Sequence, residues 1–412
     1  ESTAFEYKVA SAELMYTVSF SAQVDGLLEV AISDHGSVIA SASAQTNARS
    51  ETRLRFVIKH PQLWSPDMPH LYDVSLKLTN HQANDIDTVE SYLGLREIST
   101  ADGALRLNEQ PLYLRGVLDQ GYFPEGWYTA LTDDDIRRDV ELTLAMGFNC
   151  ARKHQKAEDP RYLYWADKLG LLVWAEMPSG RIFSTELVEA LTSEWIDLVK
   201  RDRGHPCVMA WVPFNESWGV WHQAVRPVQR AFVDGVVGLT KALDSSRCVV
   251  GNDGWEFSSG DLWTLHLYFE NRDIATRLDE LIADPSKSVT DEYGGHKRAG
   301  ALPAAAVEGL PILLTECGGI GFGRYSDSDF SYGDIPQSEE ALEQHIRKIT
   351  DMIDTAGSLQ GFVWTQLTDI QQEINGLLYF DRTPKLPLAS INALMTAIGS
   401  KRDRSGRLNQ GS

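Results

Sequence analysis

Two glutamates that follow apolar stretches are the clearest candidates for chemistry in this sequence. Glu216 follows Val208–Phe214 after a single asparagine, and Glu316 directly follows Pro311–Thr315. An apolar run with β-branched or aromatic residues fits a strand that is buried on both faces, as in a parallel sheet. A carboxylate at the end of such a strand costs free energy unless it is paired or used in a reaction. Two carboxylates placed in this way are what acid/base and nucleophilic chemistry on a sugar requires.

Nine other polar or aromatic residues lie at or just beyond predicted strand ends. Trp and Tyr rings stack on sugar rings, while Asn, Asp, His and Arg side chains hydrogen-bond to hydroxyl groups. We therefore predict a carbohydrate-binding site formed by Asp119, Arg152, His154, Asn215, Trp218, Asp253, His266, Tyr268 and Trp364. Glu176 and Asp369 also follow strands, but a salt bridge explains each equally well, and both are left out of the predicted site.

Single members of this set also have purely structural interpretations. Taken alone, Arg152 is typical of a buried ion-pair partner, and His266 and Trp364 are typical of core residues. Their occurrence together at successive strand ends favours a binding site. The first strand end carries no His-x-His metal pair, and the chemistry expected of the two glutamates requires no metal and no cofactor. The glycine-rich stretch Gly319–Gly323 lacks the full dinucleotide-binding spacing.

The elements that must position these residues alternate between strand and helix from about residue 98 onward. Helical stretches begin at capping residues such as Thr132 and end near glycines such as Gly147. Eight such units predict a (β/α)8 TIM barrel, in which the active site lies at the carboxyl ends of the strands; a doubly wound sheet is the competing topology. The strand candidates are Pro111–Val117, Phe148–Arg152, Leu171–Glu176, Val208–Phe214, Cys248–Gly251, Leu262–Leu267, Pro311–Thr315 and Gly361–Thr365.

The first 97 residues alternate apolar and polar positions with period two, most clearly at Tyr72, Val74, Leu76 and Leu78. Several short strands separated by turns predict an immunoglobulin-like β-sandwich. No cluster of catalytic residue types occurs there. We therefore expect a structural or interface domain at 1–97 and a catalytic barrel at 98–412.

Composition limits the classes of partner. The formal net charge of −20 argues against binding to nucleic acid or to an anionic membrane, and no apolar run is long enough to span a bilayer. The spacing of the four cysteines matches no zinc motif, so buried reduced thiols in a cytoplasmic protein are expected. A carbohydrate is the expected substrate, and a homo-oligomer is compatible with the sequence.

Four stretches resemble motifs of glycoside hydrolase family 2, and the resemblance covers nearly the whole chain. Leu63–Tyr72 resembles a motif of the family's immunoglobulin-like domain, and Leu112–Val117 resembles its first barrel strand. Phe214–Ser217 and Thr315–Gly319 resemble its acid/base and nucleophile motifs, although Cys317 stands where the family usually has an aromatic residue.

The resemblance implies a retaining, double-displacement mechanism. Glu316 would attack the anomeric carbon and form a glycosyl-enzyme, and Glu216 would protonate the leaving oxygen and then deprotonate water. Arg152 and Tyr268 would keep Glu316 ionised, and Asn215 would hydrogen-bond to the sugar 2-hydroxyl. Retention requires carboxyl groups ~5–5.5 Å apart.

The activity expected is that of an exo-acting β-glycosidase on a neutral sugar, with a β-galactoside first and a galactofuranoside or arabinofuranoside next. The segment Gly376–Lys385 lacks the Asn-x-Lys pair of the family's glucuronidases, although Arg382 and Lys385 keep a β-glucuronidase open. A transglycosylase shares every residue named above. The family's usual jelly-roll domain is expected to be missing ahead of the sandwich, which leaves a non-catalytic carbohydrate-binding relic as a further alternative.

Overall fold

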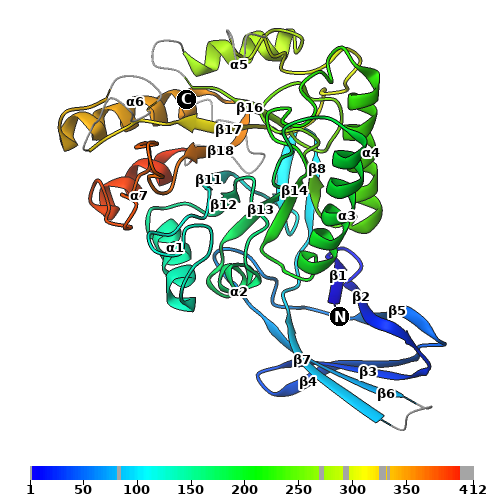
Figure 1. The fold of residues 1–412 in the computed structure, drawn as a ribbon. Helices are drawn as coiled ribbons and strands as arrows, with labels where there is room; N and C mark the ends of the chain where they lie inside the picture. Colours follow the sequence, from blue (N-terminus) through cyan, green and yellow to red (C-terminus); the bar gives the residue numbers. More distant parts are fainter. Residues whose placement is uncertain are drawn as a thin grey trace.

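The computed structural model describes residues 2–80, 85–268, 273–290, 297–323, 331 and 335–399. Figure 1 shows a small all-β part at the N-terminus, drawn in blue and light blue, and a larger part in which helices surround a central set of strands. The predicted immunoglobulin-like β-sandwich followed by a (β/α)8 TIM barrel is confirmed. The polar tail Lys401–Ser412 lies outside the described residues.

The N-terminal part consists of two antiparallel sheets with the strand orders β1-β2-β5 and β4-β3-β6-β7. Along β3, Leu28, Val30 and Ile32 are buried and the residues between them are more exposed, because successive side chains of a strand point to opposite faces. Apolar residues of both sheets form one core cluster. The strands are β1 Ser2–Lys8, β2 Glu13–Val24, β3 Gly26–Asp34, β4 Ser37–Gln45, β5 Arg49–Val57, β6 Tyr72–Asn80 and β7 Asp85–Leu93.

A small antiparallel sheet that the sequence did not reveal precedes the barrel. It consists of β8 Ile98–Ala101, β9 Ala104–Leu107 and β10 Gln110–Pro111. Pro111, predicted as the start of the first barrel strand, ends this sheet instead. The first barrel strand begins three residues later, at Leu114.

Eight parallel strands form the barrel in the order β15-β14-β13-β12-β11-β18-β17-β16. Since β11 pairs with β18, the first and last barrel strands are neighbours. At the ends of this order, the N–H of His266 on β16 donates to the carbonyl oxygen of Gly254, which follows β15, at 3.1 Å. The strands are β11 Leu114–Asp119, β12 Cys150–Lys153, β13 Leu172–Glu176, β14 Val208–Val212, β15 Cys248–Val249, β16 Trp263–His266, β17 Ile312–Gly318 and β18 Leu359–Thr365.

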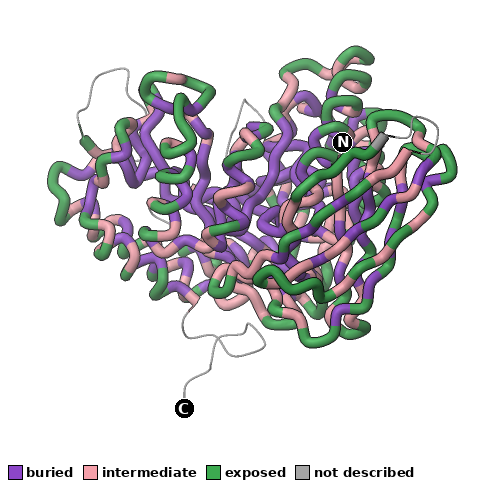
Figure 2. The backbone as a smooth tube through the Cα atoms, turned by 90° about the horizontal axis from the view of Figure 1, so that it is seen from below, coloured by how far each residue is buried: buried purple, intermediate pink, exposed green. Residues whose placement is uncertain are grey.

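Helices follow seven of the eight strands in the described part of the chain, and Figure 2 shows their exposed outer faces around a buried centre. They are α1 Asp133–Ala145, α2 Pro160–Leu169, α3 Thr185–Asp202, α4 Pro227–Leu243, α5 Ile274–Ala283, α6 Glu339–Thr355 and α7 Leu388–Ala397. The predicted capping box of Thr132 and Asp135 is present at α1. None of these helices is long and apolar enough to cross a bilayer, and all four cysteines are buried and unpaired, as predicted.

The fifth of the eight predicted β/α units has no helix between its strand and the next, since residues 250–262 contain none, and no helical stretch was predicted there from the sequence. Glycines reverse the chain there instead. Gly254 has φ 99° and Gly260 has φ 147°, values that other residues rarely adopt. A Cβ on Gly251 would lie 2.4 Å from the carbonyl oxygen of Ser259, so the two arms of the turn approach too closely for a side chain.

Buried polar contacts join the sandwich to the barrel. Arg96 is 1% exposed and donates from Nε to the carbonyl oxygen of Pro206 at 3.1 Å and from Nη2 to that of Val208 at 3.0 Å. Trp64 donates from Nε1 to the carbonyl oxygen of Asp167 at 2.8 Å. Arg96 therefore fixes the sandwich to the segment that leads into β14.

Replacing Arg96 by alanine should lower the free energy of unfolding by roughly 2–4 kcal/mol, because the carbonyl group of Pro206 would lose its donor and that of Val208 would keep only Nε of Arg247. Urea denaturation followed by tryptophan fluorescence measures the change. Arg55→Ala is the matched control, since the Arg55 side chain is 63% exposed and its loss should shift stability by less than about 0.5 kcal/mol. Equal midpoints for the two variants would contradict the anchoring role of Arg96.

Candidate active site

Arg152 is the centre of a buried network of charged groups. It lies on β12, and its side chain is completely buried. Nε donates to Glu176 Oε2 and Nη1 donates to Glu316 Oε1, both at 2.8 Å. Nη2 donates to Asn215 Oδ1 at 2.6 Å and pairs with Asp253 Oδ2 at 3.0 Å. One guanidinium thus orients side chains from four other strand ends, because its planar fork offers five donors in fixed directions.

Glu316 lies near the end of β17 and is held as an anion. Besides Arg152, it accepts a hydrogen bond from the Tyr268 hydroxyl, which lies 2.5 Å from Oε2. Nδ1 of His266 lies 3.5 Å from Oε1. Burial alone would raise the pKa of Glu316, but the charges of His266 and Arg152 outweigh burial and lower the pKa below its ordinary value.

Glu216 has the opposite protonation tendency. Burial raises its pKa, and the nearby charge of Glu316 raises it further. A contact of 2.8 Å between its Oε1 and Nδ1 of His266 opposes this rise without cancelling it. The two carboxyl groups therefore differ in charge over a range of pH, one ionised and the other protonated.

The backbone that carries Glu216 is strained. Glu216 has φ 51° and Ser217 has φ 59°, in the left-handed region that costs non-glycine residues on the order of 1–3 kcal/mol each. Two hydrogen bonds hold this turn. The N–H of Glu216 donates to the carbonyl oxygen of Asp253 at 2.9 Å, and the N–H of Ser217 donates to Oδ1 of Asn252 at 2.8 Å.

His266 lies between the carboxyl groups as a cation. Burial lowers its pKa, but the charges of Glu316 and Asp253 dominate and raise the pKa to about 10. Asp253 is completely buried, with Oδ2 3.3 Å from Nε2 of His266, and Oδ1 accepts a hydrogen bond from the Thr315 hydroxyl at 2.8 Å. His266 and Thr315 thus contact one oxygen each of the Asp253 carboxylate.

Glu216, His266 and Glu316 each bring one ligand atom to within 4.8 Å of the others. Such a group has the donor types for a metal ion. An imidazole must be neutral to bind a metal, however, whereas the surrounding carboxylates favour the protonated ring of His266. The arrangement therefore fits an ion-paired carboxylate couple better than a metal centre.

His154, Asn215 and Tyr268, three residues of the predicted site, also lie at this couple. Nδ1 of His154 is 3.2 Å from Nη2 of Arg152 and 4.0 Å from Oε1 of Glu316. Burial, followed by the charge of Arg152, lowers the pKa of His154 to about 3, so its ring is neutral. The side chains of Glu216 and His154 are 13% and 17% exposed, which leaves the couple in contact with solvent.

Two predicted residues lie near the couple without a contact to it in the described structure. Asp119 pairs with Lys153 Nζ at 2.5 Å and accepts a hydrogen bond from the N–H of Gly121 at 2.7 Å, in a second charged cluster at the ends of β11 and β12. Trp218 is partly buried, and its ring meets that of Trp221 edge to face, with centroids 4.5 Å apart.

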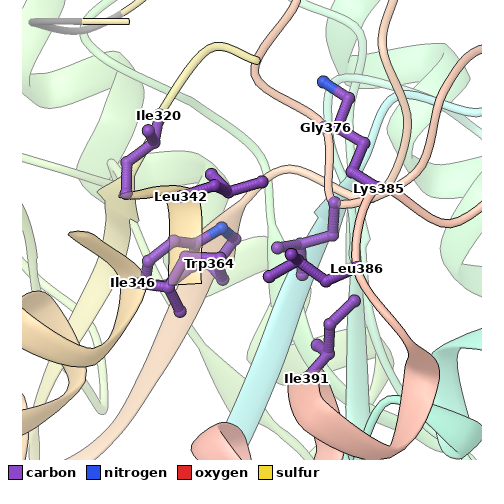
Figure 3. A pocket seen from close by; sticks show the side chains of 9 residues that line it. Ile320, Leu342, Ile346, Trp364, Gly376, Lys385, Leu386 and Ile391 are labelled. Atoms are coloured by element: carbon purple, nitrogen blue, oxygen red, sulfur yellow. The ribbon is translucent and has the colours of Figure 1, made fainter. Parts of the chain in front are cut away.

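Trp364 does not join the site. It is 1% exposed and lines a small apolar cavity with Leu342 and Ile346 of α6, as Figure 3 shows. The reason is the alternation of side chains along β18: its neighbour Thr365 lies in the site, 3.0 Å from the Tyr268 hydroxyl, so Trp364 points to the helix-covered face. The predicted sugar contact of Trp364 therefore finds no support in its position.

Besides Thr365, sequence reasoning missed further residues that contact the network, among them Glu176 and Thr315. Glu176, set aside as a salt-bridge partner, is such a partner, but its partner is Arg152 at the centre of the site. Burial raises the pKa of Glu176 to about 7. Thr315 orients Asp253, and its position directly before Glu316 was the one available signal.

Family models match both parts of the chain. The model described as "Glycosyl hydrolases family 2" matches residues 3–96, and the model for the TIM barrel domain of the same family matches residues 98–399. The second match covers more than half of the chain.

Relatives and solved structures agree with these matches. The chain is 28% identical to a β-galactosidase from Pseudoalteromonas haloplanktis over 79% of its own length, and 31% identical to one from Vibrio cholerae over 81%. It spans about a third of each relative (31% and 32%). It has the fold of a β-galacturonidase from Eisenbergiella tayi (TM-score 0.76, 18% identity, covering 100% of this chain and 72% of that one) and of a β-glucuronidase from Parabacteroides merdae (0.74, 19%, 96% and 53%).

The two histidines of the site should differ in charge at neutral pH. In ¹⁵N-histidine NMR spectra between pH 5 and 8.5, His266 should show the imidazolium pattern throughout, because its pKa is raised to about 10. His154 should show a neutral ring throughout, since its pKa is lowered to about 3. Single His→Asn variants assign the signals. A His266 that titrates near its ordinary pKa of ~6.5 would contradict the ion-paired arrangement.

Proposed function

The chain belongs to glycosyl hydrolase family 2, and on that premise we propose that it is a retaining exo-β-glycosidase acting on a neutral sugar, with a β-galactoside as the leading candidate. The observation that carries the proposal is the closeness of two carboxyl groups with opposite charge tendencies. Oxygens of Glu216 and Glu316 lie within 4.8 Å of each other. Retaining glycosidases need carboxyl groups ~5–5.5 Å apart, whereas inverting enzymes need ~6.5–9.5 Å.

Glu316 is the nucleophile in this proposal. Its ionised Oε1 or Oε2 attacks the anomeric carbon, the bond to the leaving oxygen breaks, and an ester between Glu316 and the sugar forms. Hydrogen bonds from Arg152 and Tyr268 lower the pKa of the carboxyl and hold it in one orientation. Both donors also stabilise the carboxylate when water later releases it from the ester.

Glu216 is the acid and then the base. Its raised pKa keeps a proton available for the leaving oxygen in the first step. When Glu316 becomes an ester, its negative charge disappears, and with it one cause of the raised pKa of Glu216. Glu216 can then accept a proton from the water that attacks the ester.

The remaining predicted residues have binding or supporting roles in this proposal. Arg152 holds Oδ1 of Asn215, which leaves the amide NH₂ to donate to the sugar 2-hydroxyl, a contact that strengthens in the transition state. The partly exposed His154 and Trp218 contact the sugar. Asp253 and His266 offset each other's charge next to the two carboxyl groups. Asp119 binds the sugar at the edge of the site.

A neutral sugar is favoured over a uronate by two buried ion pairs. Arg382 and Lys385 were the two cations that kept β-glucuronidase activity among the alternatives. Arg382 pairs with Asp139 at 2.9 Å and Lys385 with Asp369 at 2.6 Å, and all four side chains are largely buried. The names of the matched relatives favour a galactoside. We also propose that the domain boundary lies between residues 97 and 98, which the limits of the two family models support.

Replacing Glu316 by alanine should lower kcat on an aryl glycoside by several orders of magnitude, because the covalent step loses its nucleophile. Added azide should restore product formation as an α-glycosyl azide, since the small anion occupies the vacated side of the ring. Glu216→Ala should instead give the β-glycosyl azide with a dinitrophenyl substrate. Turnover of Glu316→Ala near that of the wild-type chain would remove the assignment of the nucleophile.

A panel of aryl glycosides tests the choice of sugar. We expect the highest kcat/KM for 4-nitrophenyl β-galactopyranoside, lower values for β-galactofuranoside and α-arabinofuranoside, and the lowest for β-glucuronide, because the two nearby cations are already paired. Product analysis with an added acceptor sugar separates a hydrolase from a transglycosylase. Sugar binding by calorimetry without any turnover would instead indicate the binding relic.

A further inference from the structure

The turn that carries Glu216 is held from behind by a buried polar cluster that has no part in the mechanism described above. Its members are at most 3% exposed, and they come from the segments after β14 and β15 and from the chain ahead of β17: Ser217, Gln223, Asn252, Glu256 and Arg298. Burying this many polar groups costs free energy unless each finds a partner, so the cluster requires an explanation.

The hydroxyl of Ser217 is the centre of the cluster, and all its hydrogen-bonding capacity is used. It donates to Oε2 of Glu256 at 2.7 Å and accepts from Nε2 of Gln223 at 3.0 Å and from Nδ2 of Asn252 at 3.2 Å. A hydroxyl has one donor and two acceptor sites, and each is occupied here. The orientation of the side chain next to Glu216 is therefore fixed from three directions.

Glu256 and Arg298 connect this hydroxyl to the rest of the loop. Nη1 of Arg298 lies 3.1 Å from Oε1 of Glu256 and donates to the carbonyl oxygen of Trp221 at 2.9 Å. The guanidinium also stacks on the Trp221 ring, 5.0 Å from its centroid. The N–H of Glu256 donates to the carbonyl oxygen of Ala299 at 2.6 Å. The loop from Glu216 to Gln223 is thus attached at both ends to one buried ion pair.

We propose that Ser217, Glu256 and Arg298 are positioning residues for proton transfer by Glu216, an inference that rests on the proposed function. Glu216 and Ser217 both occupy the left-handed region, which the chain leaves readily unless its surroundings hold it. A change of φ at either residue would swing the Glu216 carboxyl away from the leaving oxygen, and an acid must lie within hydrogen-bond reach of the atom it protonates.

This role predicts a dependence on the leaving group. A 2,4-dinitrophenolate leaves without protonation, whereas methanol does not, so misplacing the acid slows the first step only for the methyl glycoside. Glu316 lies on β17 and keeps its own contacts with Arg152 and Tyr268 in either case. A general loss of structure would slow both substrates alike.

The experiment compares kcat/KM on 2,4-dinitrophenyl and methyl β-galactopyranoside, or on the same pair for whichever sugar the panel selects. Ser217→Ala should lower the value for the methyl glycoside about 30-fold, less than the roughly 10²–10⁴-fold that general acid catalysis contributes because the acid is displaced and not removed, and the value for the dinitrophenyl glycoside less than about 3-fold. Azide should raise kcat of the variant on the dinitrophenyl glycoside, because it replaces the water that Glu216 activates.

Thr240→Ala is the matched control. Thr240 is completely buried on α4, and its hydroxyl accepts a hydrogen bond from Nε1 of Trp195 at 2.7 Å, away from the Glu216 loop. The Thr240→Ala variant should lower Tm by about as much as Ser217→Ala does. Its effects on kcat/KM should be small and equal for the two substrates. Glu256→Gln keeps the size of the side chain, so it tests the proposal even if Ser217→Ala does not fold. It should also lower kcat/KM selectively for the methyl glycoside, by a smaller factor than Ser217→Ala.

Equal losses on the two substrates in Ser217→Ala, or in Glu256→Gln where the first does not fold, would overturn the positioning role and leave the proposed function intact. Absence of turnover by the wild-type chain on every glycoside tested would overturn the proposed function and the positioning role together. A selective loss in Thr240→Ala would also overturn the inference, because any buried change would then produce the same signature.

Discussion

The charge balance around Arg152 determines the properties of the whole site. Arg152 and His266 are two cations within a network that contains four carboxyl groups, those of Glu176, Glu216, Asp253 and Glu316. Buried charges are stable only when they are compensated, so the two surplus carboxyl groups are driven toward the protonated form. The pKa values of Glu176 and Glu216 are raised accordingly, while Asp253 and Glu316 stay anionic. In the proposed mechanism, the proton that Glu216 donates thus follows from an imbalance of charge. A lysine could not replace Arg152, because it lacks the planar fork that reaches several strand ends.

The missing helix of the fifth unit has a counterpart in the site. Instead of a helix, the segment after β15 supplies Asn252 and Asp253, which hold the strained turn at Glu216, and Glu256, which contacts Ser217. Its glycine turns allow this, since Gly254 approaches His266 so closely that a Cβ would lie 2.5 Å from Nδ1. The fifth unit therefore contributes less to the outer layer of helices and more to the support of the turn that carries Glu216.

Much of the architecture could be predicted from the sequence because it depends on local patterns. Period-two alternation predicted the sandwich, and the repeated order of strand and helix predicted the barrel. Most of the residues selected by type at strand ends lie close together in the structure, because parallel strands of a barrel deliver their carboxyl ends to one face. The failures have equally physical causes. Trp364 and Thr365 are adjacent in sequence and on opposite faces of β18, a choice set by register, which a strand of unknown length does not reveal. The partners of Arg152 lie at the ends of other strands. Whether such a side chain belongs to the site or to a separate salt bridge therefore depends on how the strands pack.

The pairing of β11 with β18 has a consequence for the order in which the chain acquires its chemistry. Ribosomal synthesis proceeds from the N-terminus, so Glu216 and Glu316 are both made before Thr365, which contacts Tyr268 beside Glu316. Closing the ring requires contact between residues about 250 positions apart in sequence, a slow, non-local event. A nascent chain that has not yet added β18 therefore carries Glu216 and Glu316 without the completed surroundings that set their pKa values. The complete surroundings of the two carboxyl groups therefore form only after β18 docks against β11.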